Sequence, residues 1–251
     1  DGEYIDSQTI TVTVNAVNDA PTANAAAGTT AEDQSVVINL SGSDIDGDNL
    51  TFSLGDDATS GSVSIDGSLA TYTPNTDFNG SDSFTFSVSD GEYSASASVD
   101  VDVTAVNDAP VLALVSDVSF DEDQGGSTNL SGSDVDGDQL TFSITEGTDI
   151  VASLNVNDVS FSAPLNFNGS ESFTVSVTDG EYTDSQTITV TVITVNDAPV
   201  LAFVSAQNMD EGGTKVVLLS GTDVDEDVLT YSITDGINIL SSIDGSTITF
   251  N

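Results

Sequence analysis

The chain repeats itself with a period of about 89 residues. The motif Val-Asn-Asp-Ala-Pro occurs three times, starting at Val17, Val106 and Val195, so both intervals are 89 residues. A second motif, Asp-Gly-Glu-Tyr, also occurs three times at the same interval. Because independent motifs share one period, we expect tandem copies of one structural unit, each with its own core.

This period predicts four segments. Residues 1–16 are expected to be the tail of a preceding repeat, residues 17–105 and 106–194 two complete repeats, and residues 195–251 a truncated one. Both ends therefore fall inside a repeat, which favours a segment cut from a longer array, since a natural terminus would more often cap a domain.

Apolar residues alternate with polar ones inside each repeat. In the first repeat Leu50, Phe52 and Leu54 alternate with Thr51 and Ser53, and the second repeat has the same pattern. Such alternation is typical of antiparallel strands with one buried face, and Asp-Gly and Asn-Gly pairs between the runs indicate turns. The sequence therefore predicts an all-β fold with about seven strands per repeat, packed as a two-sheet sandwich.

Charge and composition exclude several classes of function. The 251 residues include 42 Asp and Glu but only one basic residue, Lys215, for a net charge of −41, with no His and no Cys. We therefore expect no nucleic-acid partner and no binding to an anionic membrane. A Ser-His-Asp triad and the usual Cys/His zinc site are excluded, and no apolar stretch approaches the 18 residues of a membrane-spanning helix.

An enzyme is not expected either. Paired carboxylates are able to hydrolyse glycosides without His. Here the acidic groups recur in every repeat, whereas a catalytic site rarely does.

The acidic residues gather in recurring loops. The motif Asp-x-Asp-Gly-Asp places three carboxylates within five residues, at Asp44, Asp46 and Asp48 and again at Asp134, Asp136 and Asp138, and a weaker copy contains Asp223 and Asp225. Such clustering is repulsive unless a cation relieves it, and Ca²⁺ suits a carboxylate-rich loop because it takes six to eight oxygen ligands. The alternative is a polar turn in a protein whose acidity serves solubility.

Other acidic residues recur in register with these loops. They are Glu32, Glu122 and Glu211 early in each repeat, the linker pairs Asn18/Asp19, Asn107/Asp108 and Asn196/Asp197, and Asp90 and Asp179 after the Phe-rich segment.

The order of these motifs resembles the bacterial cadherin-like tandem repeats of large secreted or surface adhesins. The resemblance rests on the Asn-Asp-Ala-Pro linkers, the early Glu, Asp-x-Asp-Gly-Asp, Tyr-Thr-Pro-Asn at residues 72–75, and the segment from Phe78 to Gly91. It implies immunoglobulin/cadherin-like seven-stranded β-sandwiches arranged end to end, Ca²⁺ as the cofactor, and an extracellular or cell-surface location.

The resemblance also implies a ligand set, because cadherins hold Ca²⁺ between consecutive domains. One junction would use Glu32, Asn107, Asp108, Asp134, Asp136 and Asp179; a second would use Asn18, Asp19, Asp44, Asp46 and Asp90; a third would use Glu122, Asn196, Asp197, Asp223 and Asp225. Asp77 or Asp82 would replace a further cadherin carboxylate. The linkers carry fewer ligands than cadherin linkers, which implies fewer or weaker ions, and an ion inside the loop of a single domain stays an alternative.

Two functions follow as expectations. The first is a spacer of an adhesin or surface filament, rigidified by Ca²⁺, whose partners are the neighbouring repeats of the same polypeptide. The alternative is a calcium-dependent recognition module that binds a glycan or another copy of itself. For glycan binding, Tyr4, Tyr93 and Tyr182 are the candidate platforms, although they equally suit a role in covering the end of a sandwich.

Overall fold

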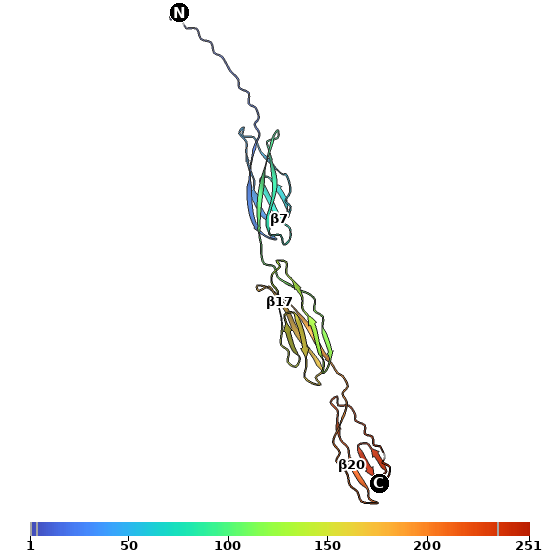
Figure 1. Cartoon of the computed structure of the whole chain (residues 1–251). Helices are drawn as coiled ribbons and strands as arrows, with labels where there is room; N and C mark the ends of the chain where they lie inside the picture. The colour runs from blue at the N-terminus through green and yellow to red at the C-terminus, as the bar shows by residue number, and fades with distance from the viewer. Residues whose placement is uncertain (1, 4, 235) are drawn as a thin grey trace. The chain divides into compact units, whose positions relative to one another are not determined.

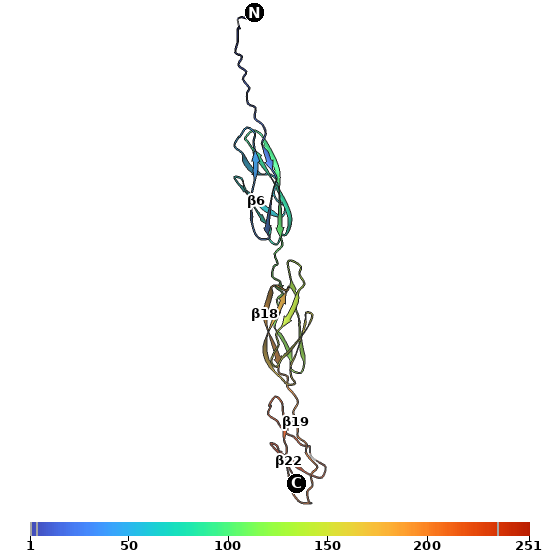
Figure 2. The same ribbon diagram turned by 90° about the vertical axis from the view of Figure 1, so that its left-hand side faces the viewer.

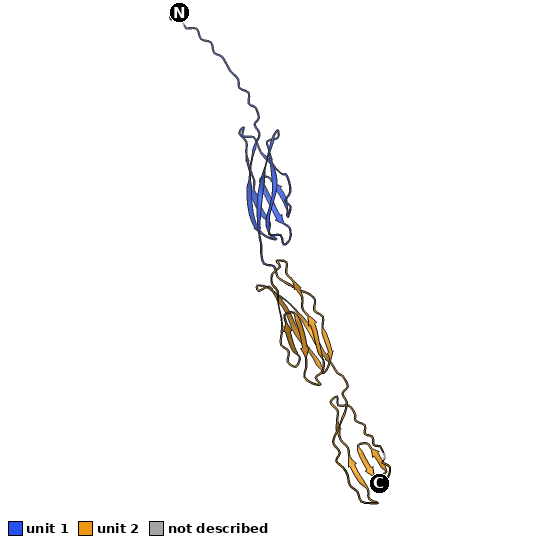
Figure 3. Cartoon of the chain, in the orientation of Figure 1, with its two compact units in different colours: residues 1–108 blue, residues 109–251 orange. Residues whose placement is uncertain are grey.

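The computed structural model of the chain describes residues 2–3, 5–234 and 236–251, and its regular structure is entirely β-strand. The chain divides into two compact units, Asp1–Asp108 and Ala109–Asn251 (Figure 3), and each is described by itself. None of the described residues forms a helix long and apolar enough to cross a membrane.

Unit 1 contains one β-sandwich, formed by the first repeat (Figure 1). Its strands are β1 (Thr22–Asn24), β2 (Ala26–Ala31), β3 (Val36–Asn39), β4 (Ser41–Ser43), β5 (Thr51–Leu54), β6 (Gly61–Asp66), β7 (Leu69–Pro74), β8 (Gly80–Ser89) and β9 (Ser94–Thr104). One sheet has four strands in the order β2, β9, β8, β5, and the other has three in the order β3, β7, β6. The view in Figure 2 shows the strands of both layers.

The core of this sandwich consists of the apolar side chains that alternate along the strands. Phe84, Phe86 and Val88 of β8 are buried, and they pack with buried Ile38 of β3 and Tyr72 of β7. The intervening Ser and Thr residues of β8 lie on the opposite face of the sheet. The alternation in the sequence therefore predicted both the strands and their buried face.

The nine strand segments of the repeat correspond to seven passes of the chain. β1 and β2 lie on the first pass, which changes sheets: β1 pairs antiparallel with β4, whereas β2 pairs parallel with β9. β3 and β4 share the second pass, and the first half of that pass pairs with β7. The expected seven-stranded sandwich is confirmed, and the change of sheet is a feature that hydrophobic alternation does not reveal.

Unit 2 contains the second and third repeats. The second repeat has the same topology as the first, with sheets in the orders β11, β18, β17, β14 and β12, β16, β15. Its strands are β10 (Val111–Leu112), β11 (Val118–Asp121), β12 (Gly125–Asn129), β13 (Gly132–Ser133), β14 (Thr141–Ile144), β15 (Val151–Asn155), β16 (Asp158–Ser162), β17 (Gly169–Thr178) and β18 (Thr183–Ile193).

The third repeat has a smaller set of strands. They are β19 (Val200–Leu201), β20 (Lys215–Leu218), β21 (Gly221–Thr222), β22 (Ser241–Asp244) and β23 (Thr247–Phe250). β20, β23 and β22 form one three-stranded sheet, and among the described residues of this repeat the buried core consists of Val217, Leu219 and Ile248.

A buried carboxylate sits inside the first sandwich. Asp82 of β8 accepts hydrogen bonds from the hydroxyl of Tyr72 at 2.9 Å and from the backbone amides of Thr59 and Ser60 at 3.1 and 2.8 Å. Burial acts to raise the pKa of Asp82, but the hydrogen bonds from Ser60, Ser83, Thr59 and Tyr72 outweigh it, so that the pKa lies below its usual value.

The second repeat also has a hydrogen-bonded carboxylate at this position, but the side chains involved are different. Glu171 occupies the matching place on β17, and its carboxylate accepts from the amides of Thr148 and Asp149 at 2.9 and 2.7 Å. Phe161 stands where the first repeat has Tyr72, and its ring packs edge-on against Phe173. In each repeat the acidic side chain therefore binds the backbone of a loop between two strands. The loop lies between β5 and β6 in the first repeat and between β14 and β15 in the second.

Tyr72→Phe should destabilise the first repeat by about 1–2 kcal/mol, because Asp82 loses one of its donors but keeps its backbone amides. Hydrogen exchange of the amides in β7 and β8 is the suitable measurement, since it separates one repeat from another. Protection in β16 and β17 should not change. Equal protection of β7 in wild type and variant would contradict a stabilising role for this hydrogen bond.

Candidate metal sites at the ends of the repeats

The linker at the start of unit 1 is held by two acidic loops. The Asn18 side-chain amide donates to Oδ2 of Asp90 at 3.0 Å, and the Asp19 backbone amide donates to Oδ2 of Asp46 at 2.8 Å. The pKa of Asp90 is lowered mainly by the backbone N–H of Tyr93, with burial acting against it and the Glu92 amide and Asn18 adding to it. Four of the residues expected at this site therefore form two hydrogen-bonded pairs, Asn18 with Asp90 and Asp19 with Asp46.

The Asp-x-Asp-Gly-Asp loop folds around its first carboxylate. The Asp46 amide donates to Oδ1 of Asp44 at 2.8 Å, and Asp44, Asp46 and Asp48 each place one carboxylate oxygen within 4.8 Å of the others. Gly47 lies at φ +82°, a left-handed conformation that explains Gly at this place in the motif. Oδ2 of Asp44 is buried and accepts no hydrogen bond.

The second and third repeats build the same loop. In the second, the amides of Asp136 and Asp138 donate to Oδ1 of Asp134 at 2.9 and 3.3 Å, and Oδ2 of Asp134 is buried without a hydrogen bond. In the third, the Asp225 amide donates to Oδ1 of Asp223 at 3.0 Å, and Glu226 takes the left-handed conformation at φ +63° that Gly takes elsewhere.

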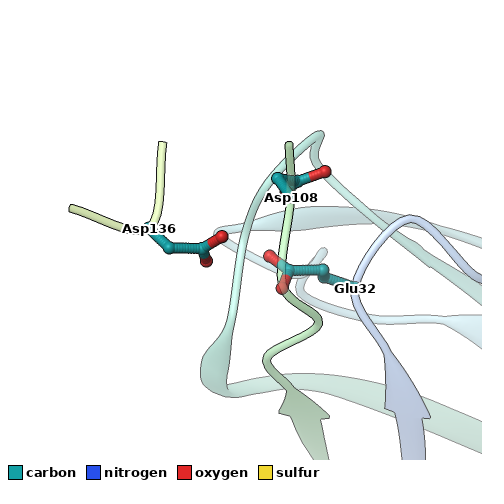
Figure 4. Close-up of side chains that lie close together, drawn as sticks. All are labelled: Glu32, Asp108 and Asp136. Carbon is teal, nitrogen blue, oxygen red and sulfur yellow. The ribbon is translucent and has the colours of Figure 1, made fainter. Parts of the chain in front are cut away.

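The far end of unit 1 gathers four acidic residues. Glu32 directly follows β2 and is buried, and its carboxylate accepts from the backbone amide of Val106 and from the side chain of Asn79. Glu32 and Asp108 have carboxylate oxygens within 4.8 Å of each other (Figure 4), and Asp33, Asp77 and Asp108 form a second such set. The linker aspartate therefore lies beside carboxylates from the turn after β2 and from the loop before β8.

This arrangement favours Asp77 over Asp82 as the further carboxylate of the candidate site. Asp77 belongs to the carboxylate cluster, and its backbone amide donates to Oδ1 of Asp33 at 3.3 Å. Asp82 has both oxygens occupied by protein donors inside the sandwich, so it is not free to bind a metal. The sequence interpretation overlooked Asp33, although the pair Glu-Asp recurs at residues 32–33 and 122–123 and marks both clusters.

Unit 2 contains the corresponding cluster within a single compact body. Glu122 directly follows β11 and is buried, and its carboxylate accepts from the Val195 amide at 2.6 Å. The Asp197 amide donates to Oδ2 of Asp225 at 2.6 Å. One carboxylate oxygen from each of Glu122, Asp197 and Asp225 lies within 4.8 Å of the others, so the second repeat, the linker and the third repeat all contribute.

The electrostatics of this cluster are unfavourable for protein atoms alone. Oδ2 of Asp197 is buried and accepts no hydrogen bond. Burial raises the pKa of Asp197, and repulsion from Asp225, Asp123, Glu122 and Asp223 raises it further. A buried carboxylate oxygen without a donor needs a cation or a proton, and the donor set, which is oxygen alone, fits a hard divalent cation.

Of the other expected residues, Asn107, Asn196 and Asp179 make hydrogen bonds to residues near them in the sequence. Asn107 and Asn196 donate from their side chains to the carbonyls of Asp108 and Asp197 at 3.2 and 3.0 Å. Asp179 accepts from the amides of Glu181 and Tyr182, both at 2.7 Å, as Asp90 does in the first repeat. Glu211 is exposed in a turn before β20.

Comparison with known proteins agrees with this fold. Residues 18–104 match the family model of a bacterial Ig domain, and residues 107–194 match that of a bacterial cadherin-like domain. Two consecutive segments of the chain thus match a bacterial Ig domain and a bacterial cadherin-like domain in tandem, which confirms the resemblance seen in the sequence.

Individual proteins show more distant similarity. Over 130 residues, half of this chain, the sequence is 32% identical to chitinase A of Pseudoalteromonas piscicida, of which it spans 16%. Among solved structures, the protocadherin gamma B4 extracellular domain is 18% identical, with a TM-score of 0.56 over 92% of this chain and 43% of that one. The EC3–6 cis-dimer structure of protocadherin gamma B7 is 16% identical, with a TM-score of 0.52 over 89% of this chain and 62% of that one. Both likenesses support the cadherin-like fold.

Asp197→Asn should raise the melting temperature of unit 2 when divalent cations are removed with EDTA. The substitution keeps the side-chain shape but removes one of several mutually repelling carboxylates. Differential scanning calorimetry in EDTA measures the change. Asp149→Asn, which removes an exposed charge outside the cluster, is the matched control, and an equal rise in both variants would show that net charge alone is responsible.

Proposed function

We propose that this chain is a spacer segment of an extracellular or surface protein, in which Ca²⁺ binds at the ends of the repeats and holds neighbouring repeats in a defined arrangement. The proposal is supported by the tandem Ig and cadherin-like domains. The observation that carries it is Oδ2 of Asp197, a buried carboxylate oxygen without a hydrogen bond inside a cluster of carboxylates.

In unit 2 the ion would be held by Glu122, Asp197 and Asp225, with Asp223 adjacent. Ca²⁺ supplies positive charge that neutralises these carboxylates and accepts their oxygens as ligands. Glu122 also accepts a hydrogen bond from the linker amide of Val195, so that the same side chain holds the linker and would bind the ion.

At the ends of unit 1 the same chemistry is available. One end would hold a cation with Glu32, Asp33, Asp77 and Asp108. The other end would hold one with Asp44, Asp46 and Asp48. The Asp134, Asp136 and Asp138 loop of the second repeat has the same fold as the latter and is proposed to act in the same way.

The mechanical consequence follows from linkage. A cation that binds the cluster only when linker and loops are folded together stabilises that state, by about 1.4 kcal/mol at ten times its dissociation constant. Millimolar extracellular Ca²⁺ suits sites of modest affinity. Without the ion, repulsion among the carboxylates favours a looser linker.

Ca²⁺ should raise the melting temperature of the chain, and EDTA should reverse the effect. Glu122→Gln and Asp197→Asn should each weaken binding by about tenfold or more, because each removes a charged ligand. Isothermal titration calorimetry measures the affinity, and Asp149→Asn again serves as the control. Identical melting curves and scattering profiles in Ca²⁺ and EDTA would refute the proposal.

Asp33 and Asp77 allow a separate test in the first repeat. Asp77→Asn should weaken the site at the end of unit 1, whereas Asp82→Asn should lower the stability of the first repeat without changing its affinity for Ca²⁺. Terbium luminescence, competed with Ca²⁺, follows binding in both variants.

Glycan binding is a second candidate function. Tyr93 and Tyr182 occupy the same place in two repeats and are 46% and 45% exposed, which leaves part of each ring available for stacking on a sugar. The match to part of a chitinase makes chitin the first polysaccharide to try. Tyr4, the third expected platform, lies outside the described residues.

Retention of the chain on insoluble chitin would support this second function. Tyr93→Ala combined with Tyr182→Ala should then abolish retention, while Glu92→Ala combined with Glu181→Ala, which changes the preceding residues, should not. If chitin and other insoluble polysaccharides do not retain the chain, glycan binding is contradicted and only the spacer role remains.

A further inference from the structure

The two complete repeats share an unusual pair of turns at the end that carries the buried glutamate. Asp33 and Asp123 occupy equivalent positions and have left-handed backbone conformations, with φ of +59° and +62°. Asp77 and Asn166 are also equivalent, and φ is +57° at both. Four of the six described non-glycine residues with positive φ therefore lie at these two positions. Asp and Asn adopt this conformation more readily than most residues, so the backbone restricts which side chains suit these turns.

The same hydrogen bond joins the two turns in each repeat. The Asp77 amide donates to Oδ1 of Asp33 at 3.3 Å, and the Asn166 amide donates to Oδ1 of Asp123 at 2.9 Å. The next residue is phenylalanine in both repeats, and its amide donates to the carbonyl three residues before it at 3.1 Å. The backbone therefore holds the side chains of Asp77 and Asn166 at equivalent places.

In unit 1 the turns bring three carboxylates together. Asp33, Asp77 and the linker residue Asp108 each place one carboxylate oxygen within 4.8 Å of the others. Asp77 is exposed and Asp108 is half-buried. Three negative charges at this separation repel one another when no cation is present. The same three charges favour a hard divalent cation when one binds among them.

In unit 2 the equivalent set has one charge fewer. Asp123 and the linker residue Asp197 are both acidic, and Asp123 repels Asp197. Asn166 supplies a neutral amide where unit 1 has the carboxylate of Asp77. The oxygen of an Asn side chain is still a ligand for Ca²⁺, but it brings no negative charge. The two sets therefore differ by one formal charge at one position.

The other acidic positions do not distinguish the two ends. Glu32 and Glu122 are both buried, and each accepts the amide of its linker valine. The loop that follows each linker in the sequence has aspartate at the same three positions. Glu226 is an additional acid of the third repeat, where the second has Gly137, but it is exposed and lies outside the carboxylate cluster of unit 2.

We propose that this position sets the order in which the two ends bind Ca²⁺: the end with Asp77 binds Ca²⁺ about tenfold more tightly than the end with Asn166. The number of charged ligands is one of the features that tune Ca²⁺ sites over several orders of magnitude. The linker after the first repeat is then held at a lower Ca²⁺ concentration than the linker after the second, so the chain responds to Ca²⁺ in two steps. This inference rests on the proposed function and adds an order of binding to it.

The linker amides report on the two sites separately. Val106 and Val195 each donate to the buried glutamate of their own site, so each amide is sensitive to a cation that binds there. NMR spectra of the ¹⁵N-labelled 251-residue chain follow both amide signals as Ca²⁺ is added. We expect both signals to shift, and the midpoint for Val106 to lie at about tenfold lower free Ca²⁺ than the midpoint for Val195.

Exchange of the two side chains tests the cause. Asp77→Asn should raise the midpoint of Val106 about tenfold, and Asn166→Asp should lower the midpoint of Val195 by a similar factor. Aspartate suits the backbone at position 166, because Asp77 has the same φ. In EDTA the effects on stability should have the opposite sign: Asp77→Asn removes a repelling charge and should raise the melting temperature, whereas Asn166→Asp should lower it.

Leu165→Asp is the matched control, because it adds the same charge beside Asn166 on a side chain that is 78% exposed. It should shift the midpoint of Val195 much less than Asn166→Asp does. An equal shift would show that net charge sets the affinity and would overturn the inference. Equal midpoints in the wild-type chain, or midpoints that do not follow the exchange, would overturn it too but leave calcium binding intact. Linker amides that do not respond to Ca²⁺ at all would refute the proposed function, and this inference with it.

Discussion

A buried glutamate at the end of each complete repeat holds the linker to its sandwich. Glu32 and Glu122 each follow the strand that pairs parallel with the last strand of the repeat, and each accepts the backbone amide of the linker valine, Val106 or Val195. This places the linker aspartate beside the glutamate, because it lies only two residues further along. The two carboxylate clusters that contain a linker aspartate, and with them the calcium sites proposed there, depend on this one contact.

The acidity of the chain serves different purposes in different places. Asp82 and Glu171 are satisfied by protein donors and close loops inside their sandwiches. Asp197 is not satisfied, and its neighbours raise its pKa. Asp100 and Asp102 of β9 are exposed between buried valines, where charge favours solubility. Carboxylates of the same formal charge therefore have three different roles. The number of hydrogen-bond donors around each one distinguishes these roles.

The fold was predictable to a large extent, because hydrophobic alternation and turn pairs act locally. Leu50, Phe52 and Leu54 were assigned to the apolar face of a strand, and all three pack against the core of the first repeat. The crossing of the first pass from β4 to β9 was not predictable, since both sheets accept the same alternating pattern. Among the site residues, the resemblance to cadherin-like repeats implied Glu122, Asp197 and Asp225 as members of one group, but it did not separate Asp77 from Asp82 or reveal Asp33.

The sequence by itself determined the repeat, the strands and the places where carboxylates gather, because these depend on period and on neighbours along the chain. Only the tertiary structure decided which carboxylates lack partners. Asp82 meets Tyr72 because β7 and β8 face each other across the core, whereas the buried Oδ2 of Asp197 meets other carboxylates where linker and loops converge. Whether an acidic residue is satisfied depends on groups brought from distant parts of the chain, and no local pattern records them.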